Sequence, residues 1–156
     1  MPKRLGPTIT IFSRSNWSLV GWKSDQGVCL SYGAPGENAS GCGSWVAGSP
    51  RDLTRPAVRH RPQLSVFQVS RNGPGVSIRV IGLTSPRIVR VLAQFRSARR
   101  VLARLVYAPA PLQTSIHFFD VTIPGAYPLR PAIVPSPLIT LFAYDAHGRL
   151  VVRRQF

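Results

Sequence analysis

The chain has 156 residues, 44% of them hydrophobic, and its 20 lysines and arginines against five acids give a net charge of +15. This length and apolar content fit one globular domain and exclude a disordered chain. No run reaches the ~18 apolar residues of a membrane-spanning helix, and the basic start MPKRLGPTITIF lacks the apolar core of a signal peptide. We therefore expect either a cytoplasmic protein or a fragment that lacks its export signal.

The first part of the chain predicts three short strands, at 8–13, 17–23 and 27–32. Asp25, Gln26 and Gly27 form a plausible turn between the last two strands. The small-residue stretch 33–43, GAPGENASGCG, indicates a loop. The basic segment 48–63, GSPRDLTRPAVRHRPQ, contains three prolines, which exclude a regular element. We interpret 48–63 as an exposed loop or an internal linker.

The second half of the chain continues the pattern of short strands and turns. Further strands are predicted at 64–70, 75–83, 116–123, 138–144 and 149–156. The sequences RNGPG at 71–75 and DAHG at 145–148 are typical of turns. The five prolines of 124–137 predict another loop.

The longest apolar pattern and the densest positive charge coincide at 86–107, PRIVRVLAQFRSARRVLARLVY. A strand over 87–95 has one clean apolar face, formed by Val89, Val91, Ala93 and Phe95. A return strand over 100–107 has a matching face, formed by Val101, Ala103, Leu105 and Tyr107. A three-residue loop, either 96–98 or 97–99, aligns the two faces. The pattern predicts a hairpin with one buried face and one face that carries arginines.

A helix is the alternative for the same stretch. Its apolar residues also approximate a 3.6-residue period, and Pro86 suits the first turn of a helix. A basic amphipathic helix at 87–106 would give an α+β fold. The β-branched residues of the first half and the flanking Gly82, Pro86 and Pro109 favour the hairpin.

Nine or ten short strands separated by turn signals predict an all-β fold. This spacing is typical of an antiparallel sandwich or barrel rather than of a parallel α/β sheet. We expect residues 1–156 to form a single β domain, interrupted by the basic loop or linker at 48–63.

Three segments resemble immunoglobulin-like β domains of secreted or cell-envelope hypothetical proteins of actinobacteria. They are GWKSDQGVCLSY with the following loop, IGLTSPRIVRVLAQFRSARRVLARL, and LFAYDAHGRLVVRR, and the resemblance covers most of 17–46 and 75–153. Ser97 and Ala98 stand where those relatives carry Asp-Gly, which leaves the loop type open. The resemblance implies an immunoglobulin-like sandwich, an extracytoplasmic location and a disulfide, and it implies no catalytic residues.

Cys29 and Cys42 are the two cysteines of the chain. No CxxC motif and no paired histidines lie near them, which argues against zinc. In an oxidising compartment we expect a disulfide that brackets the loop at 33–43, and in the cytoplasm two free, buried thiols. Cys42-Gly43-Ser44-Trp45 partly resembles the papain-type signature, but the second cysteine is missing. A cysteine hydrolase around Cys42, with His117 or His147 as its base, is therefore a remote alternative.

No other arrangement in the sequence indicates catalysis. The motifs of serine hydrolases, P-loop proteins and zinc proteases do not occur. Asp120 and Asp145 could pair as carboxylates, but Asp145 is better explained as a turn residue. We expect a protein without enzymatic activity, cofactor or metal.

The positive charge is the property most open to a functional interpretation. In the predicted hairpin one face projects Arg90, Arg96, Arg100 and Arg104. The loop at 48–63 adds Arg55, Arg59 and Arg61. Such a field attracts anionic polymers even without evolved specificity, although the arginine bias can also be compositional. We expect weak, salt-sensitive binding of polyanions such as DNA, heparin-like polysaccharide or anionic lipid.

The function expected from these observations is a non-catalytic binding or structural module of an exported or cell-envelope protein, with polyanions or envelope components as partners. A dedicated nucleic-acid-binding protein that uses its arginine-rich face is the alternative. The arginines are scattered along the chain, and no aromatic residues interleave with them in the pattern of nucleic-acid-binding proteins.

Overall fold

The computed structural model describes residues 1–42, 62–71, 77–124 and 139–156. In these residues the chain forms twelve strands and one short 3-10 helix, η1 (Ala110–Leu112). The strands build three antiparallel sheets of four strands each, which confirms the predicted all-β class. The helix considered for 87–106 is wrong, because this stretch holds three strands. Most of the loop predicted at 48–63 lies outside the described residues.

Sheet A is an N-terminal meander in which each strand pairs with the next one along the chain. Its strands are β1 (Ile9–Ser13), β2 (Ser18–Ser24), β3 (Gly27–Ala34) and β4 (Glu37–Cys42). The last strand corrects the loop predicted at 33–43. Its residues pair with β3 from Glu37 opposite Ala34 to Cys42 opposite Cys29. The chain reverses at Gly36, whose φ of 74° suits a residue without a side chain.

Sheets B and C each combine strands that are distant in sequence. Sheet B has the order β5 (Leu64–Arg71), β6 (Ile78–Thr84), β10 (His117–Ile123) and β9 (Arg104–Tyr107). Sheet C has the order β12 (Leu150–Gln155), β11 (Ile139–Tyr144), β7 (Arg90–Phe95) and β8 (Val101–Leu102). In the described residues no helix is long and apolar enough to span a bilayer.

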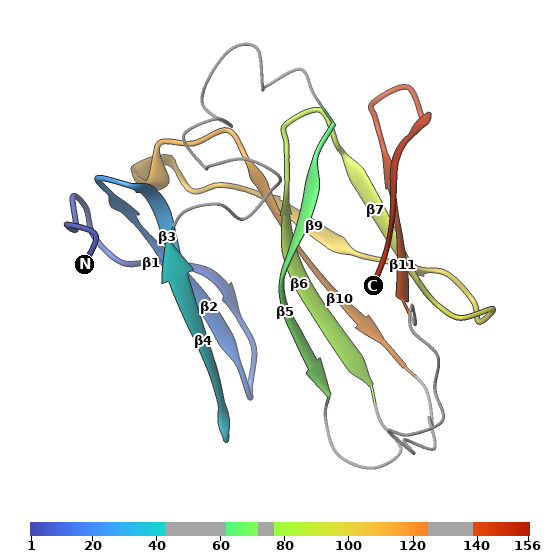
Figure 1. The fold of residues 1–156 in the computed structure, drawn as a ribbon, viewed down its shortest axis with the longest axis horizontal. Coiled ribbons are helices and arrows are strands. Elements are labelled where there is room, and N and C mark those ends of the chain that lie inside the picture. The colour runs from blue at the N-terminus through green and yellow to red at the C-terminus, as the bar shows by residue number, and fades with distance from the viewer. Residues whose placement is uncertain (43–61, 72–76, 125–138) are drawn as a thin grey trace.

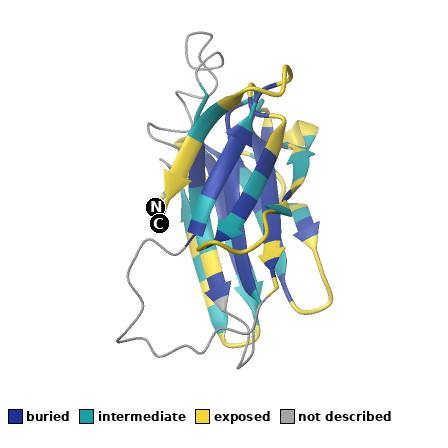
Figure 2. Ribbon diagram, turned by 90° about the vertical axis from the view of Figure 1, so that its right-hand side faces the viewer, coloured by how far each residue is buried: buried dark blue, intermediate teal, exposed yellow. Residues whose placement is uncertain are grey.

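The three sheets stack as layers, with sheet B in the middle (Figure 1). One apolar core lies between sheets B and C and includes Val80, Val91, Phe119 and Leu141. A second core lies between sheets B and A and includes Leu19, Leu30, Ile81 and Phe118. Buried residues gather in the central strands, and every residue of β6 is buried (Figure 2). Because successive side chains of a strand point to opposite faces, this pattern requires a cover on both faces of sheet B.

Gly82, in the middle of β6, is required by the close packing of β10. Phe119 lies directly opposite Gly82 in the antiparallel pair. A Cβ added at Gly82 would approach the Phe119 ring to 2.5 Å and would also collide with the carbonyl oxygen of Ser65 on β5. The aromatic ring therefore occupies the space that a side chain at position 82 would fill.

The predicted hairpin exists, but its return strand serves two sheets. Ala93 pairs with Val101, so the loop between them is 96–98, one of the two expected loops. The N–H of Ala98 donates to the carbonyl of Phe95 at 2.9 Å, and Arg96 takes a positive φ of 49°. After Ala103, whose N–H donates to Val91 at 2.9 Å, the chain leaves sheet C and enters sheet B as β9.

The predicted buried face of the hairpin is confirmed in its centre and wrong at its ends. Val91, Ala93, Phe95 and Ala103 are buried in the core between sheets B and C. Val89 and Tyr107 are 42% and 78% exposed. Strand β7 begins only at Arg90, so Val89 does not follow the alternation of the strand, and Ile88 takes the buried position. Tyr107 lies opposite His117, on the face of sheet B that points toward sheet C, but it is the last residue of β9, the edge strand of sheet B.

Candidate functional site

The outer side of sheet C gathers two of the arginines predicted to bind polyanions. Arg90 alternates along β7 with the core residues Val91, Ala93 and Phe95, and therefore faces outward. Arg100 lies just before β8 and contacts the same side of the sheet. Arg96 lies at the tip of the turn, with its guanidinium 5.6 Å from the ring centroid of Phe95. Arg55, Arg59 and Arg61 lie outside the described residues.

Arg104 does not share this face, which corrects the predicted grouping. On β9 it pairs with Asp120 of β10, in sheet B. Its guanidinium lies 5.6 Å from the ring centroid of Phe12, in sheet A. The crossing of the chain between the two sheets at Ala103 separates Arg104 from Arg90, although both belong to the predicted hairpin.

Two aromatic rings of β11 hold three arginines on the outer side of sheet C. The guanidinium carbons of Arg100 and Arg153 lie 3.9 and 5.9 Å from the ring centroid of Phe142. The guanidinium carbon of Arg90 lies 4.6 Å from the ring centroid of Tyr144, whose hydroxyl accepts a 3.3 Å hydrogen bond from Arg100 Nη1. These distances fall within the range of cation–π contacts. We call these five residues the arginine face.

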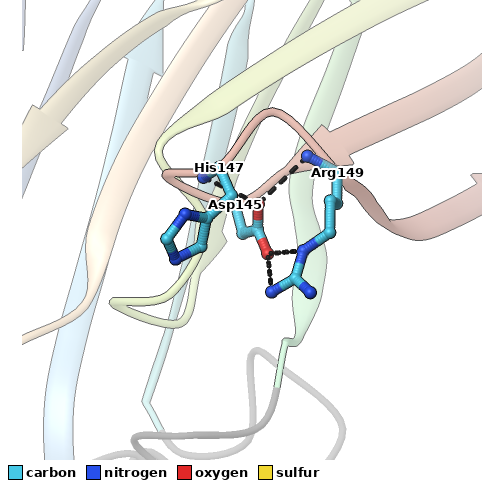
Figure 3. A network of polar contacts seen from close by, with 3 residues as sticks. All are labelled: Asp145, His147 and Arg149. Atoms are coloured by element: carbon cyan, nitrogen blue, oxygen red, sulfur yellow. Dashed lines mark hydrogen bonds and ion pairs between the residues drawn. The ribbon is translucent and has the colours of Figure 1, made fainter.

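The described strands of sheet C contain no aspartate or glutamate to neutralise the arginine face. The nearest acid along the chain is Asp145, in the turn between β11 and β12 (Figure 3). Its Oδ1 accepts from the backbone N–H groups of His147 at 2.9 Å and Arg149 at 3.0 Å. Its Oδ2 accepts from Arg149 Nε at 3.1 Å and lies 3.0 Å from Arg149 Nη2. The negative charge of this turn is therefore matched within the turn itself.

The pKa of Asp145 reflects the same contacts. Desolvation raises the pKa of this carboxyl, but the N–H groups of Arg149 and His147 and the Arg149 guanidinium outweigh it. The pKa consequently lies below the ordinary value, and Asp145 is ionised at neutral pH. The prediction that Asp145 acts as a turn residue is confirmed by its hydrogen bonds. Asp120 lies on β10, in another sheet.

Two hollows share Val89, and the first of them borders the arginine face at Arg90. The first has a volume of about 430 Å³ and is lined by residues that include Val89, Arg90, Leu102 and Ala146. The second has a volume of about 320 Å³ and is lined by residues that include Val89, Tyr107, Ser115 and His117. Hollows of this size fall in the lower part of the range of small-molecule sites.

His117 is held in one tautomer at the second hollow. Its Nδ1 lies 2.8 Å from the carbonyl oxygen of Ile88, which can only accept, so Nδ1 carries the proton. Burial lowers the pKa of His117, and the hydrogen bond to Ile88 offsets only part of this effect. At neutral pH the imidazole is therefore uncharged, and Nε2 is its hydrogen-bond acceptor.

Cys29 and Cys42 form a disulfide between β3 and β4. The two residues are directly opposed in the strand pair, with their Cα atoms 4.1 Å apart. This confirms the predicted pairing, and neither cysteine of the chain is free. A cysteine nucleophile must be a thiolate, which the bonded Sγ of Cys42 is not. The described residues also contain no cluster of three potential metal ligands.

A buried polar cluster between sheets A and B was missed by the sequence analysis. Arg79 is 5% exposed, donates from Nη1 to the hydroxyl of Tyr32 at 3.0 Å, and stacks 4.6 Å from the ring centroid of Trp17. The hydroxyl of Ser70 lies 3.1 Å from that of Tyr32 and 3.0 Å from Oε1 of Glu37. An arginine within the apolar run SIRVIGL was the available signal. Because this cluster is buried, we interpret it as structural.

In comparisons with known proteins, no family model, curated protein or solved structure matches the chain.

Proposed function

We propose that the chain is a non-catalytic binding module of an exported or cell-envelope protein and that it binds anionic polymers at the arginine face. The observation that supports this proposal most is the array of three guanidinium groups over Phe142 and Tyr144. The described strands of sheet C contain no carboxylate that would compete with a ligand for these groups. A guanidinium presents a planar fork of donors that matches phosphate, sulfate and carboxylate groups. Stacking on a ring restricts the side chain before the ligand arrives, which reduces the entropy lost on binding.

The strand order supports an immunoglobulin-like assignment for sheets B and C. Immunoglobulin constant-type domains pack a sheet of strands A, B, E and D on a sheet of strands C, F and G. With β5, β6, β7, β9, β10, β11 and β12 taken as A to G, sheet B has the order A-B-E-D, and sheet C has the order G-F-C followed by β8. Sheet A is then an addition to this sandwich.

The disulfide supports an extracytoplasmic location. Disulfides persist in secreted and envelope compartments and are rare in the reducing cytoplasm. The Cys29–Cys42 bond links two neighbouring strands of a small β structure, which fits a protein that works outside the cytoplasm.

The covered aromatic rings argue for recognition of charge rather than of bases. Proteins specialised for single-stranded nucleic acid stack bases on open aromatic faces. Here guanidinium groups lie over Phe142 and Tyr144, and Phe142 is 6% exposed. The face therefore offers donors for anionic groups and little free ring surface for bases, and we expect binding that does not depend on base sequence.

The test is a titration of labelled DNA duplexes of several sequences, with a single-stranded competitor and heparin, at about 50 and 150 mM salt. We expect similar affinities for all duplexes and a steep loss at the higher salt, because counterion release drives the binding. In the Arg90→Gln/Arg100→Gln variant, the slope of log affinity against log salt should fall by about 0.9 for each arginine that contacts a phosphate.

The matched control is Lys3→Gln/Arg4→Gln, which removes the same charge from the N-terminal end beside sheet A. It should reduce binding less than the double change on the arginine face. Equal losses of affinity in the two variants would show that binding depends only on net charge and would overturn the arginine face as the binding site. A preferred sequence that survives 150 mM salt would support the nucleic-acid-binding alternative instead.

A further inference from the structure

The second hollow combines an open aromatic ring with apolar walls. Tyr107 is 78% exposed, and its ring meets that of His117 nearly at right angles with centroids 4.6 Å apart. Val89, Pro86 and Ala108 contribute apolar surface to the same hollow. Unlike the rings of the arginine face, Tyr107 has no guanidinium stacked on it among the described residues. Most of its ring is therefore available to a ligand.

The polar groups of this hollow are uncharged. Thr114 and Ser115 line the hollow: Thr114 Oγ1 accepts a 3.4 Å hydrogen bond from the N–H of Ile116, whereas Ser115 Oγ is buried and has no hydrogen-bond partner in the described part of the chain. His117 contributes a neutral ring whose Nε2 accepts, since Nδ1 donates to Ile88. The described lining residues include no charged side chain. Such a site can exchange hydrogen bonds with hydroxyl groups, but it supplies no partner for an ionised group.

A sugar ring has the chemistry that fits these groups. Its C–H face is apolar and can stack on a tyrosine ring, while its hydroxyls both donate and accept hydrogen bonds. The bases of a DNA duplex are stacked on one another and must be flipped out to reach such a ring, whereas the sugar rings of a polysaccharide are already exposed. The volume of about 320 Å³ is sufficient for a ring of hexose size.

Val89 connects this hollow with the arginine face. It lines both hollows, and the next residue, Arg90, lines the first one and stacks on Tyr144. A polymer seated on Tyr107 can therefore continue past Val89 to the guanidinium groups. Stacking and charge contacts would then alternate along one chain.

We propose that the hollow at Tyr107 is a sugar-ring subsite that extends the arginine face, so that the anionic polymer is an acidic polysaccharide. This inference rests on the proposed polyanion binding. The neutral subsite holds a sugar ring by stacking and hydroxyl contacts, and the arginine face holds the carboxylate or sulfate groups of neighbouring units.

The test compares heparin and polygalacturonate with a DNA duplex at one salt concentration, for the intact protein, Tyr107→Ala and Tyr107→Phe. Tyr107→Ala should lower the affinity for both polysaccharides by about tenfold and leave the affinity for DNA unchanged. Tyr107→Phe should retain the affinity, because the ring remains. Because Tyr107 is highly exposed, we expect both variants to fold, and circular dichroism of each variant is compared with that of the intact protein.

A second measurement locates the ligand. Trigalacturonate added to isotope-labelled protein should shift the amide resonances of Val89, Tyr107 and Ser115, and Thr114→Val should reduce its affinity. Equal losses of DNA and polysaccharide in Tyr107→Ala, or no loss of either, would overturn the sugar subsite while the arginine face stands. If no polyanion binds at about 50 mM salt, the proposed function itself fails.

Discussion

Sheet B is covered on both faces, and the two covers differ in chemistry. Its contact with sheet C is an apolar core built around Val80, Phe119, Val121 and Ile123, and the buried polar residues Thr84 and His117 of β6 and β10 lie toward one end of it. Its contact with sheet A combines the apolar residues Ile81, Leu83 and Phe118 with Arg79 and Asp120, both buried. Sheet B lies between its two neighbours (Figure 1), and its strands β6 and β10 consist almost entirely of buried residues.

The polar contacts of the A–B interface are only partly satisfied. Oδ2 of Asp120 lies 3.4 Å from Arg14 Nη2, whereas its Oδ1 has no hydrogen-bond partner among the described residues. Nε of Arg79 is likewise buried without a partner there. Such groups cost stability, because they lose water without full replacement. Both interfaces therefore bury a large apolar cluster, and sheet A is held against sheet B by polar contacts in addition to this packing.

The largest expected effect comes from two neighbouring residues of one strand, each of which packs in a different interface. Phe118 and Phe119 are both fully buried on β10, but Phe118 faces sheet A and Phe119 faces sheet C. Replacing either by Ala should lower the free energy of unfolding by about 3 to 5 kcal/mol, as measured by urea denaturation. In native-state hydrogen exchange, Phe118→Ala should deprotect β2 and β3 while β7 and β11 stay protected. Equal deprotection of all three sheets in both variants would contradict the comparison.

A smaller effect is expected from overpacking the B–C core. Gly82→Ala places a methyl group against the Phe119 ring and the Ser65 carbonyl, and should cost about 3 kcal/mol. Gly33→Ala, on β3 of sheet A, is the matched control, because its Cβ would meet only Asn38 Oδ1 at 3.7 Å. Thermal or urea unfolding of the two variants measures the difference. Similar costs at the two positions would show that Phe119 and β5 can move away from residue 82.

The smallest effect concerns the buried cation of the A–B interface. Arg79→Met keeps most of the side-chain volume and removes the unpartnered Nε, so the free energy of unfolding should change by no more than about 1 kcal/mol. Arg79→Ala leaves a cavity beside Trp17 and Tyr32 and should cost about 2 kcal/mol or more. Urea denaturation distinguishes the two. If the Met variant loses as much stability as the Ala variant, the charge of Arg79 itself stabilises the interface.

The alternation of apolar residues was sufficient to predict the centre of the hairpin. Val91, Ala93 and Phe95 are buried because a regular strand repeats every two residues. The same reasoning failed for Arg104, since alternation says nothing of the point at which a chain changes sheets. It also failed for β4, whose sequence ENASGC has little strand propensity. That strand is held by its pairing with β3 and by the disulfide, which are contacts beyond the local sequence.

The candidate site was predictable only in part. Two of its arginines, Arg90 and Arg100, were identified from the sequence, whereas Arg153 and both aromatic rings come from strands far along the chain. Their proximity depends on the pairing of β11 with β7 and β12. The continuous apolar run of β6 was a signal for burial on both faces, but it could not identify sheet A as the second cover.

The order of the sheets along the chain has a consequence for synthesis. Sheet A pairs only strands that follow one another, so we expect it to close early, as the chain leaves the ribosome. Sheets B and C must wait for distant partners, because Ile78 pairs with Ile123 and Arg90 with Tyr144. Until β10 has been made, the apolar side of the meander lacks its cover. The nascent chain should therefore present a temporary surface for chaperones, which disappears once sheet B is complete.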